Sequence, residues 1–126
     1  MRAAGLPRES RIRRASDFAA MRDASGRLGG RCFSVRYRAN ELGYARLGLA
    51  ISKRVSKRAV DRNRIKRLLR ESFRRVRHDL PPVDLLLMAR EQAVDLPGHE
   101  LLAELDTLWK RIKPLKPNPA AVTIAG

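Results

Sequence analysis

Three segments of the chain carry the apolar pattern that is typical of β-strands. Residues 32–38 read CFSVRYR and residues 46–52 read RLGLAIS, and in both an apolar side chain recurs at every second position. Residues 83–89 read VDLLLMA, a nearly continuous apolar run that indicates a buried strand. The segment 40–43 predicts a hairpin between the first two strands. Pairing of the third strand with the second would make the sheet mixed.

Three further segments, at about 16–24, 60–78 and 98–113, show the spacing of amphipathic helices. In the long middle helix, Ile65, Leu69, Phe73 and Val76 share one side, and the Leu80-Pro81-Pro82 sequence ends it. The element order is therefore helix–strand–strand–helix–strand–helix. This order predicts an α+β two-layer sandwich, a small sheet with three helices packed on one side of it.

The domain organisation follows from length and from the unpatterned segments. A chain of 126 residues fits one domain, which we expect over residues 1–113 and with a basic arm at 1–14. Gly26, Gly29 and Gly30 predict a flexible loop before the first strand. Residues 114–126 contain three prolines and no apolar period, and we expect a disordered tail there.

The charge of the chain changes this picture, because the formal net charge is +15 and the sequence pI is about 11.5. Twelve of the 28 Lys and Arg residues lie within residues 53–78, where only Asp61 and Glu71 are acidic. Arg62, Lys66 and Arg70 follow one another at four-residue spacing, so a helix would align them in one repulsive ridge. Such a ridge indicates a polyanionic partner, and nucleic acid fits best.

A membrane partner is not expected. The apolar face of a membrane-surface helix must be free for lipid, whereas here the predicted sheet would cover it. The first 14 residues contain no apolar run, so they do not resemble a secretory signal. Cys32 is the only cysteine, which suits a reducing compartment, and we expect a cytoplasmic protein.

The sequence offers little catalytic or metal-binding chemistry. His78 and His99 are the only histidines, and both lie at predicted helix ends. One cysteine cannot form a zinc finger, and Gly29-Gly30 is not followed by the residues of a Walker loop. Glu100 and Glu104 are best interpreted as the solvated face of the last helix. We therefore expect no catalytic residue and no metal site in the protein itself.

Two kinds of nucleic acid remain as candidates. An Arg-Asn-Arg helix can read guanine and adenine in a DNA major groove, which would make the chain a DNA-binding regulator. Single-stranded RNA suits an aromatic residue such as Phe18 beside a basic sheet face better. That face carries Arg36 and Arg38 beside the small residues of the second strand. It would otherwise be an ordinary solvated side of the sheet.

One stretch of the sequence resembles a known family. Ser52-Lys53-Arg54, followed by the segment RNRIKRLLRESFR at 62–74, resembles the signature of the bacterial ribonuclease P protein subunit. Leu6-Pro7-Arg8-Glu9, Asp17-Phe18, Arg46-Leu47-Gly48-Leu49, the segment 80–90 and Leu108-Trp109-Lys110-Arg111 extend the resemblance over about residues 6–113. A ribosome-associated RNA-binding protein is the other RNA alternative.

The resemblance implies a fold and an activity. The fold would be similar to the second domain of a small-subunit ribosomal protein, with a left-handed βαβ crossover through the long helix. The protein would be the cofactor of a catalytic RNA that removes the 5′ leader from precursor tRNA, in a 1:1 holoenzyme. It would bind the ribonuclease P RNA and precursor tRNA but no cofactor of its own, since Mg²⁺ would be held mainly by the RNA.

The resemblance also implies roles for individual residues. One set would face the catalytic RNA: Lys53, Arg54, Arg62, Asn63, Arg64, Lys66, Arg67 and Arg70. A second set would line the cleft for the single-stranded leader: Phe18, Ser34 and Arg36. The family often has an aromatic residue where Arg36 stands, so guanidinium stacking or a phosphate contact would replace aromatic stacking there. By alternation, Phe33, Val35 and Tyr37 point to the core.

Overall fold

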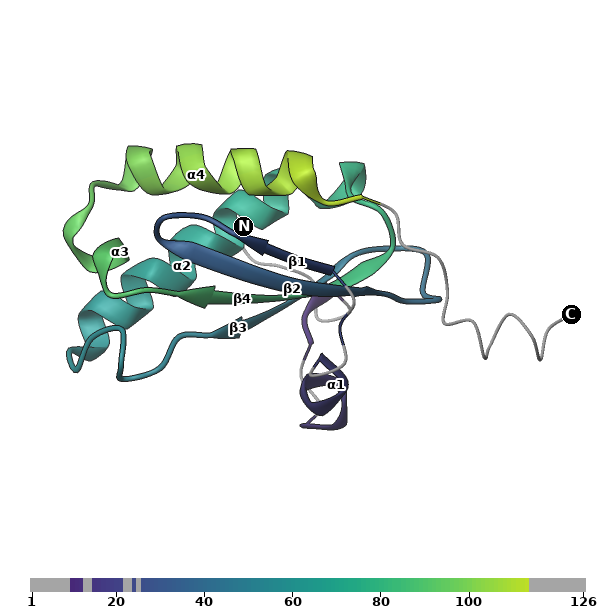
Figure 1. Cartoon of the computed structure of the whole chain (residues 1–126), viewed down its shortest axis with the longest axis horizontal. Helices are drawn as coiled ribbons and strands as arrows, with labels where there is room; N and C mark the ends of the chain where they lie inside the picture. Colours follow the sequence, from purple (N-terminus) through teal and green to yellow (C-terminus); the bar gives the residue numbers. More distant parts are fainter. Residues whose placement is uncertain (1–9, 13–14, 22–23, 25, 114–126) are drawn as a thin grey trace, which may run out of the picture.

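The computed structural model describes residues 10–12, 15–21, 24 and 26–113. Its helices and strands follow the order α1 (Ala15–Ala20), β1 (Gly26–Gly29), β2 (Phe33–Ala39), β3 (Arg46–Ala50), α2 (Ala59–Val76), η3 (Arg77–Asp79), β4 (Val83–Ala89), α3 (Gln92–Asp95) and α4 (Gly98–Arg111) (Figure 1). The predicted tail at 114–126 and most of the predicted basic arm lie outside the described residues. The α+β class with a small mixed sheet is confirmed.

The sheet has the strand order β1-β2-β4-β3. β4 pairs antiparallel with β2 and parallel with β3, so α2 serves as the crossover between the parallel strands. The predicted hairpin between the segments 32–38 and 46–52, which form β2 and β3, is wrong, because β4 lies between these two strands. β4 is the most apolar strand, and the central position covers both of its edges. The connection at 40–45 instead passes the end of β4, with Gly43 at a φ of 84°.

The prediction of a flexible glycine loop before β2 is also wrong, since Gly26–Gly29 form the edge strand β1, paired antiparallel with β2. The glycines are needed for close approach. A Cβ atom at Gly26 would lie 2.5 Å from carbons of the Tyr37 ring, and one at Gly30 would lie 2.5 Å from Glu104 Oε2. The ring and the carboxylate therefore occupy the space that side chains would need.

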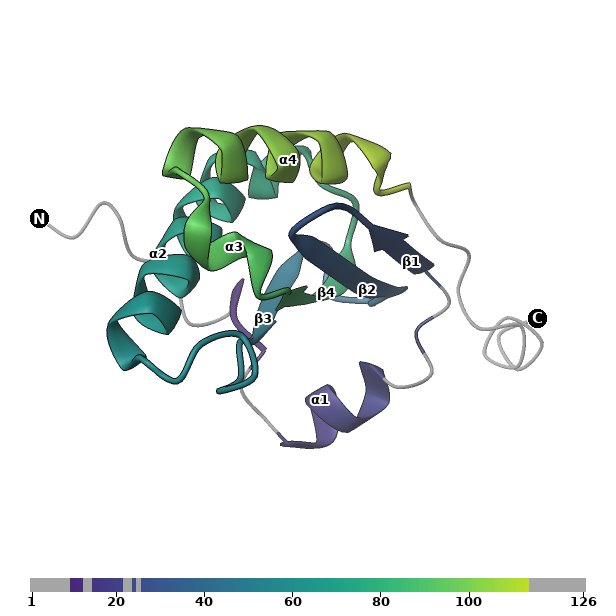
Figure 2. The same ribbon diagram turned by 60° about the vertical axis from the view of Figure 1, so that its left-hand side comes forward.

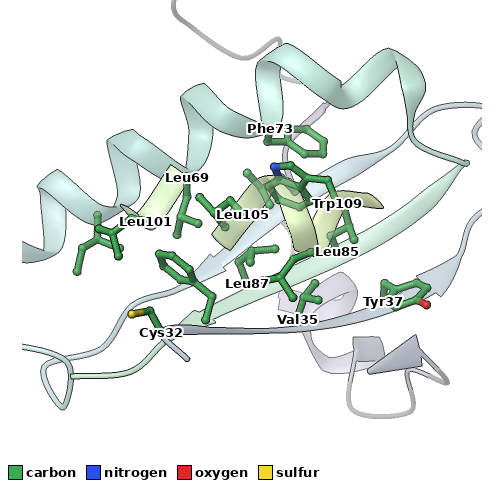
Figure 3. Packing of buried hydrophobic residues seen from close by; sticks show 14 of the residues in the cluster. Cys32, Val35, Tyr37, Leu69, Phe73, Leu85, Leu87, Leu101, Leu105 and Trp109 are labelled. Carbon is green, nitrogen blue, oxygen red and sulfur yellow. The ribbon is translucent and has the colours of Figure 1, made fainter. Parts of the chain in front are cut away.

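The hydrophobic core lies between one face of the sheet and the two long helices. α2 and α4 cover this face, while α1 lies on the opposite face, and the two ribbon views agree on this (Figures 1 and 2). The apolar pattern of the sequence predicts all three helices on one side, so the position of α1 differs from that expectation. Phe33, Val35 and Tyr37 are buried as predicted, and Figure 3 shows Val35 and Tyr37 on the strand beneath the helices.

α2 and α4 are held together by an aromatic contact and a buried hydrogen bond. The Phe73 and Trp109 rings meet edge to face, with centroids 5.9 Å apart. Trp109 Nε1 donates to Ser72 Oγ at 2.8 Å, which satisfies the polar atom of the indole inside the core. These contacts fix the rotation of α2 relative to α4 and so help to determine which flank of α2 stays exposed.

Candidate nucleic-acid interface

α2 carries its basic residues beside a narrow buried stripe of Ile65, Leu69, Ser72 and Phe73. The helix begins after a loop in which Ser56 Oγ donates to Asp61 Oδ2 at 2.9 Å. Asp61, in the first turn, also complements the positive end of the helix dipole. Seven of the other fourteen positions of the helix are Arg or Lys, and Leu68 and Val76 are partly buried against the core.

Six of the predicted RNA-binding residues keep unengaged side chains. Among the described residues none of these six side chains makes a hydrogen bond or an ion pair: Lys53, Arg54, Asn63, Lys66, Arg67 and Arg70. Lys66 is half-buried and the other five are exposed. Exposed cations without internal partners lose little when a phosphate approaches, and each releases counterions on binding.

The other two predicted residues, Arg62 and Arg64, have partners within the protein. Arg62 Nη1 donates to the carbonyls of Ser56 at 2.9 Å and Lys57 at 3.0 Å, which holds the loop before α2. Arg64 Nη2 donates to the Leu96 carbonyl at 2.9 Å, which holds the connection between α3 and α4. Both arginines of the Arg-Asn-Arg segment therefore stabilise loops of the protein itself. They are not a free pair that is available to contact bases.

The chain before α1 runs along the outer edge of β3. Ile12 N donates to the Leu47 carbonyl at 2.9 Å, and Arg77 Nη1, in η3 directly after α2, donates to the buried Ser10 Oγ at 2.9 Å. A hollow of about 220 Å³ opens there. Phe18 and the β3 edge line it on one side and Lys66 and Arg70 of α2 on the other. The helix flank and the predicted leader residue Phe18 are therefore contiguous.

The sheet face opposite the long helices holds the predicted leader residues. A Cβ atom at Gly48 would lie 2.9 Å from the Phe18 ring, so the ring rests on β3 at this glycine. Gly48 aligns with Leu86 of β4, and Leu86 aligns with Arg36 of β2. Phe18 and Arg36 thus lie on the same face but two strands apart, with Leu86 between them. Ser34 lies one row further along, opposite Met88.

A larger groove continues from this face past the carboxyl ends of the parallel strands β3 and β4. Its volume is about 800 Å³, and its lining includes Ala50 and Met88 from the strands and Arg54 and Arg90 from the loops beyond them. The carboxyl end of parallel strands is where α/β sheets commonly bind ligands. Sequence reasoning does not assign Arg90 to the site, although its position directly after an apolar strand is a usable signal.

A buried carboxylate organises the other end of the same face. The Asp84 side chain is fully buried, and Arg46 binds it through two nitrogens, at 2.8 and 2.7 Å. Asn40 donates to it at 2.9 Å, and Arg38 lies 3.6 Å away. Burial alone would raise the pKa of Asp84, but the hydrogen bonds from Arg46 and Asn40 and both arginine charges hold this pKa below its ordinary value.

Glu104 has a structural role that differs from the predicted solvated one. Its carboxylate accepts hydrogen bonds from the backbone N–H groups of Cys32 and Phe33, at 2.8 to 3.0 Å, and so anchors the β1–β2 turn to α4. Burial of Cys32, together with this neighbouring carboxylate, raises the pKa of the thiol. Cys32 is therefore a core residue.

Two negative findings apply to the described part of the chain. No three His, Cys, Asp or Glu side chains among these residues are grouped so that they could hold a metal ion. No helix among them is long and apolar enough to cross a membrane.

Comparisons with known proteins agree on one family. The family model described as Ribonuclease P matches residues 6–113. The chain is 42% identical over 106 residues to the protein called Ribonuclease P protein component of Cronobacter sakazakii, covering 84% of this chain and 89% of that protein. The protein of the same name from Thioalkalivibrio sulfidiphilus is 39% identical over 115 residues, which cover 91% and 96% of the two chains.

Solved structures give the same result. The RNase P protein of Staphylococcus aureus matches with a TM-score of 0.75 and 30% identity, over 80% of this chain and 93% of that one. The RNase P protein of Thermotoga maritima matches with a TM-score of 0.74 and 29% identity, over 82% and 97%. The fold described above is thus the fold of these proteins.

Proposed function

The chain belongs to the ribonuclease P protein family, and from this membership we propose how its surface serves the holoenzyme. The sequence motif predicted this membership. The chain is therefore the protein component of ribonuclease P, which is an endoribonuclease, and it is a partner of the ribonuclease P RNA. In our proposal the RNA subunit carries the catalytic groups. The protein binds that RNA and the 5′ leader of precursor tRNA, whose removal leaves a 5′ phosphate on the mature tRNA.

The observation that carries this proposal is the unengaged basic flank of α2. Catalytic RNA and precursor tRNA are both polyanions, so their association is opposed by charge repulsion. Exposed cations at Arg67 and Arg70 reduce this repulsion and release counterions when they meet phosphates. Since Arg62 and Arg64 are tied to backbone carbonyls, paired reading of bases in a DNA groove is the weaker proposal.

The leader is proposed to bind the opposite, α1-bearing face of the sheet. Phe18 offers an aromatic ring for stacking, and Ser34 and Arg36 offer polar contacts on β2. Mature tRNA lacks the leader, so these contacts favour substrate over product. This is a difference of binding affinities and requires no reacting group on the protein.

The proposed metal requirement is met by the RNA. Mg²⁺ prefers carboxylate, phosphate and water oxygens, whereas residues 51–76, which form the loop before α2 and the helix itself, carry eleven Lys and Arg side chains and two carboxylates, Asp61 and Glu71. This donor set does not fit a resident Mg²⁺. The protein instead favours metal binding indirectly, because it holds the substrate in register against the RNA.

A cleavage assay tests the proposed function. Purified protein is mixed with bacterial ribonuclease P RNA at low Mg²⁺, and removal of the leader from precursor tRNA is followed. We expect clear stimulation over the RNA alone, saturating at one protein per RNA. Absence of stimulation would contradict the proposal. Sequencing of the RNA that co-purifies with the protein then separates this function from a ribosomal one, which would return ribosomal RNA.

Substitution of Phe18 tests the leader site. Stacking on an aromatic ring contributes about 1–3 kcal/mol per base, so we expect Phe18→Ala to weaken binding of precursor tRNA roughly 5- to 150-fold. Binding of mature tRNA to the holoenzyme should change little. Phe18→Leu separates stacking from packing, because leucine retains the packing on Gly48 but lacks the aromatic face. A loss of precursor binding in this variant is therefore a loss of stacking. An equal loss for precursor and mature tRNA would refute the role in leader binding.

A further inference from the structure

Two arginines lie directly opposite each other on the α1-bearing face of the sheet. Arg27 of β1 and Arg36 of β2 are register partners in an antiparallel pair. Side chains at such positions share one face, with Cβ atoms about 4.5–5.5 Å apart. Arg27 is exposed and Arg36 is half-buried. Among the described residues neither makes an ion pair or a hydrogen bond through its side chain.

Like charges directly opposite each other destabilise a sheet. The neighbouring arginines Arg38 and Arg46 avoid this cost because the buried carboxylate of Asp84 lies between them. The row that contains Arg27 and Arg36 continues across the sheet through Leu86 and Gly48 and therefore contains no acidic residue. The pair has the charge and spacing for one anion between its two guanidinium groups.

We propose that Arg27 and Arg36 jointly bind one backbone phosphate of the single-stranded leader. This inference rests on the proposed function and adds Arg27, the shared phosphate and the direction in which the bases lie. A guanidinium fork suits a phosphate better than a lysine does, because it presents parallel N–H donors. Two forks from adjacent strands would hold the two sides of one phosphate.

The row also orients the RNA. Adjacent strands lie about 4.8 Å apart, so Gly48, where the Phe18 ring rests, is about 10 Å from Arg36 across β4. The phosphate end of the row is at β1 and β2, while its apolar end is at Leu86 and Phe18. The leader backbone therefore follows the β1–β2 side, with its bases directed toward Phe18. Because the contact at Arg36 is to the backbone, it is indifferent to leader sequence.

The test measures precursor tRNA binding to the holoenzyme over a range of salt concentrations for Arg27→Gln, Arg36→Gln and the double variant. For single strands the slope of log K against log salt falls by about 0.7 for each phosphate that the protein no longer neutralises. If one phosphate is shared, the arginine that remains in a single variant still neutralises it, so we expect little change in the steepness of the slope for either single variant and a decrease of about 0.7 for the double variant. A methylphosphonate introduced at one leader position should then weaken binding to the wild type but not to the double variant.

The control is Lys110→Gln on α4, an exposed cation on the layer that covers the other face of the sheet. It makes the same charge change and should leave the slope unaltered. Binding of the ribonuclease P RNA and the apo protein's unfolding free energy should not fall in Arg27→Gln, since removal of one like charge relieves repulsion. These readouts separate the removal of a phosphate-binding group from a folding defect.

Two results would overturn the inference. If the slope of the double variant decreases by about twice as much as that of a single variant, each arginine binds its own phosphate. If the slope of the double variant stays at the wild-type value, the pair is merely solvated. Both results can occur while the wild-type protein still stimulates cleavage, so they differ from failure of the proposed function, in which the wild type itself is inactive.

Discussion

Reversal of two charges on the exposed flank of α2, Arg67→Glu with Arg70→Glu, is expected to weaken binding to the ribonuclease P RNA about a thousandfold. Each exposed arginine near a phosphate contributes about 1 kcal/mol at 4 Å in water, and glutamate replaces this attraction by a similar repulsion. The two changes together therefore cost about 4 kcal/mol, and the slope of log K against log salt should fall by about 2. Filter binding with the RNA alone measures both quantities.

A matched control lies on the same helix. Arg75→Glu makes one such charge reversal at a residue whose guanidinium is already paired with Glu71 at 3.1 Å. We expect it to retain most of the RNA affinity. The double reversal should leave the fold intact, because Glu at 70 gains favourable neighbours in Lys66 and Arg74, which offsets the repulsion between Glu at 67 and Glu71. A loss in Arg75→Glu of about half the binding free energy that the double reversal loses would mean that overall charge, and no particular flank of α2, determines binding.

The secondary structure could be predicted where the apolar period is strong. The run at 83–89 corresponds residue for residue to β4, and the long helix is predicted to within about two residues. The pairing of the strands could not be predicted, since a hairpin from β2 to β3 and a crossover from β3 to β4 use the same apolar patterns. β1 was missed because Gly26 provides space for the Tyr37 ring, and that ring is eleven residues later in the chain.

The basic surface can be predicted from the sequence. Which of its cationic side chains are bound within the protein and which are free for RNA cannot. Arg62 and Arg64 look like their cationic neighbours along the chain, yet both donate to backbone carbonyls of loops. Such partners leave no sequence signal, because every residue has a carbonyl. The prediction for Glu104 was wrong for the same reason, as its partners are backbone N–H groups of the β1–β2 turn. Only the fold shows which charges are engaged inside the protein.

Replacement of the buried Asp84 is expected to have the largest effect on stability. Asp84→Asn keeps the shape of the side chain but removes the charge that binds Arg46, whose side chain is only 16% exposed. Loss of one partner from a buried ion pair costs about 3–5 kcal/mol. We expect a value near the lower end, because Arg46 and Arg38 remain partly accessible to water. Urea unfolding at neutral pH measures the difference from wild type.

The pH dependence provides a second, independent readout. The folded-state pKa of Asp84 is lowered from the ordinary value of 3.8, so its contribution to stability is complete above that value and is lost as the pH falls through the folded pKa. The stability difference between wild type and Asp84→Asn should therefore shrink in acid, below about pH 4. Asp106→Asn, at an exposed position on α4, controls for general charge effects.

The acid measurement also decides what Asp84 does for the sheet face. If the carboxylate fixes Arg38 and Arg46, its protonation frees both arginines, and the wild type in acid should approach the behaviour of the Asn variant at neutral pH. A difference that stays constant from pH 7 to below pH 4 would mean that the hydrogen bond from Asn40 stabilises this site, with little contribution from charge. In that case the arginines beside the leader face would be positioned by packing, and the cost of the variant would follow from packing alone.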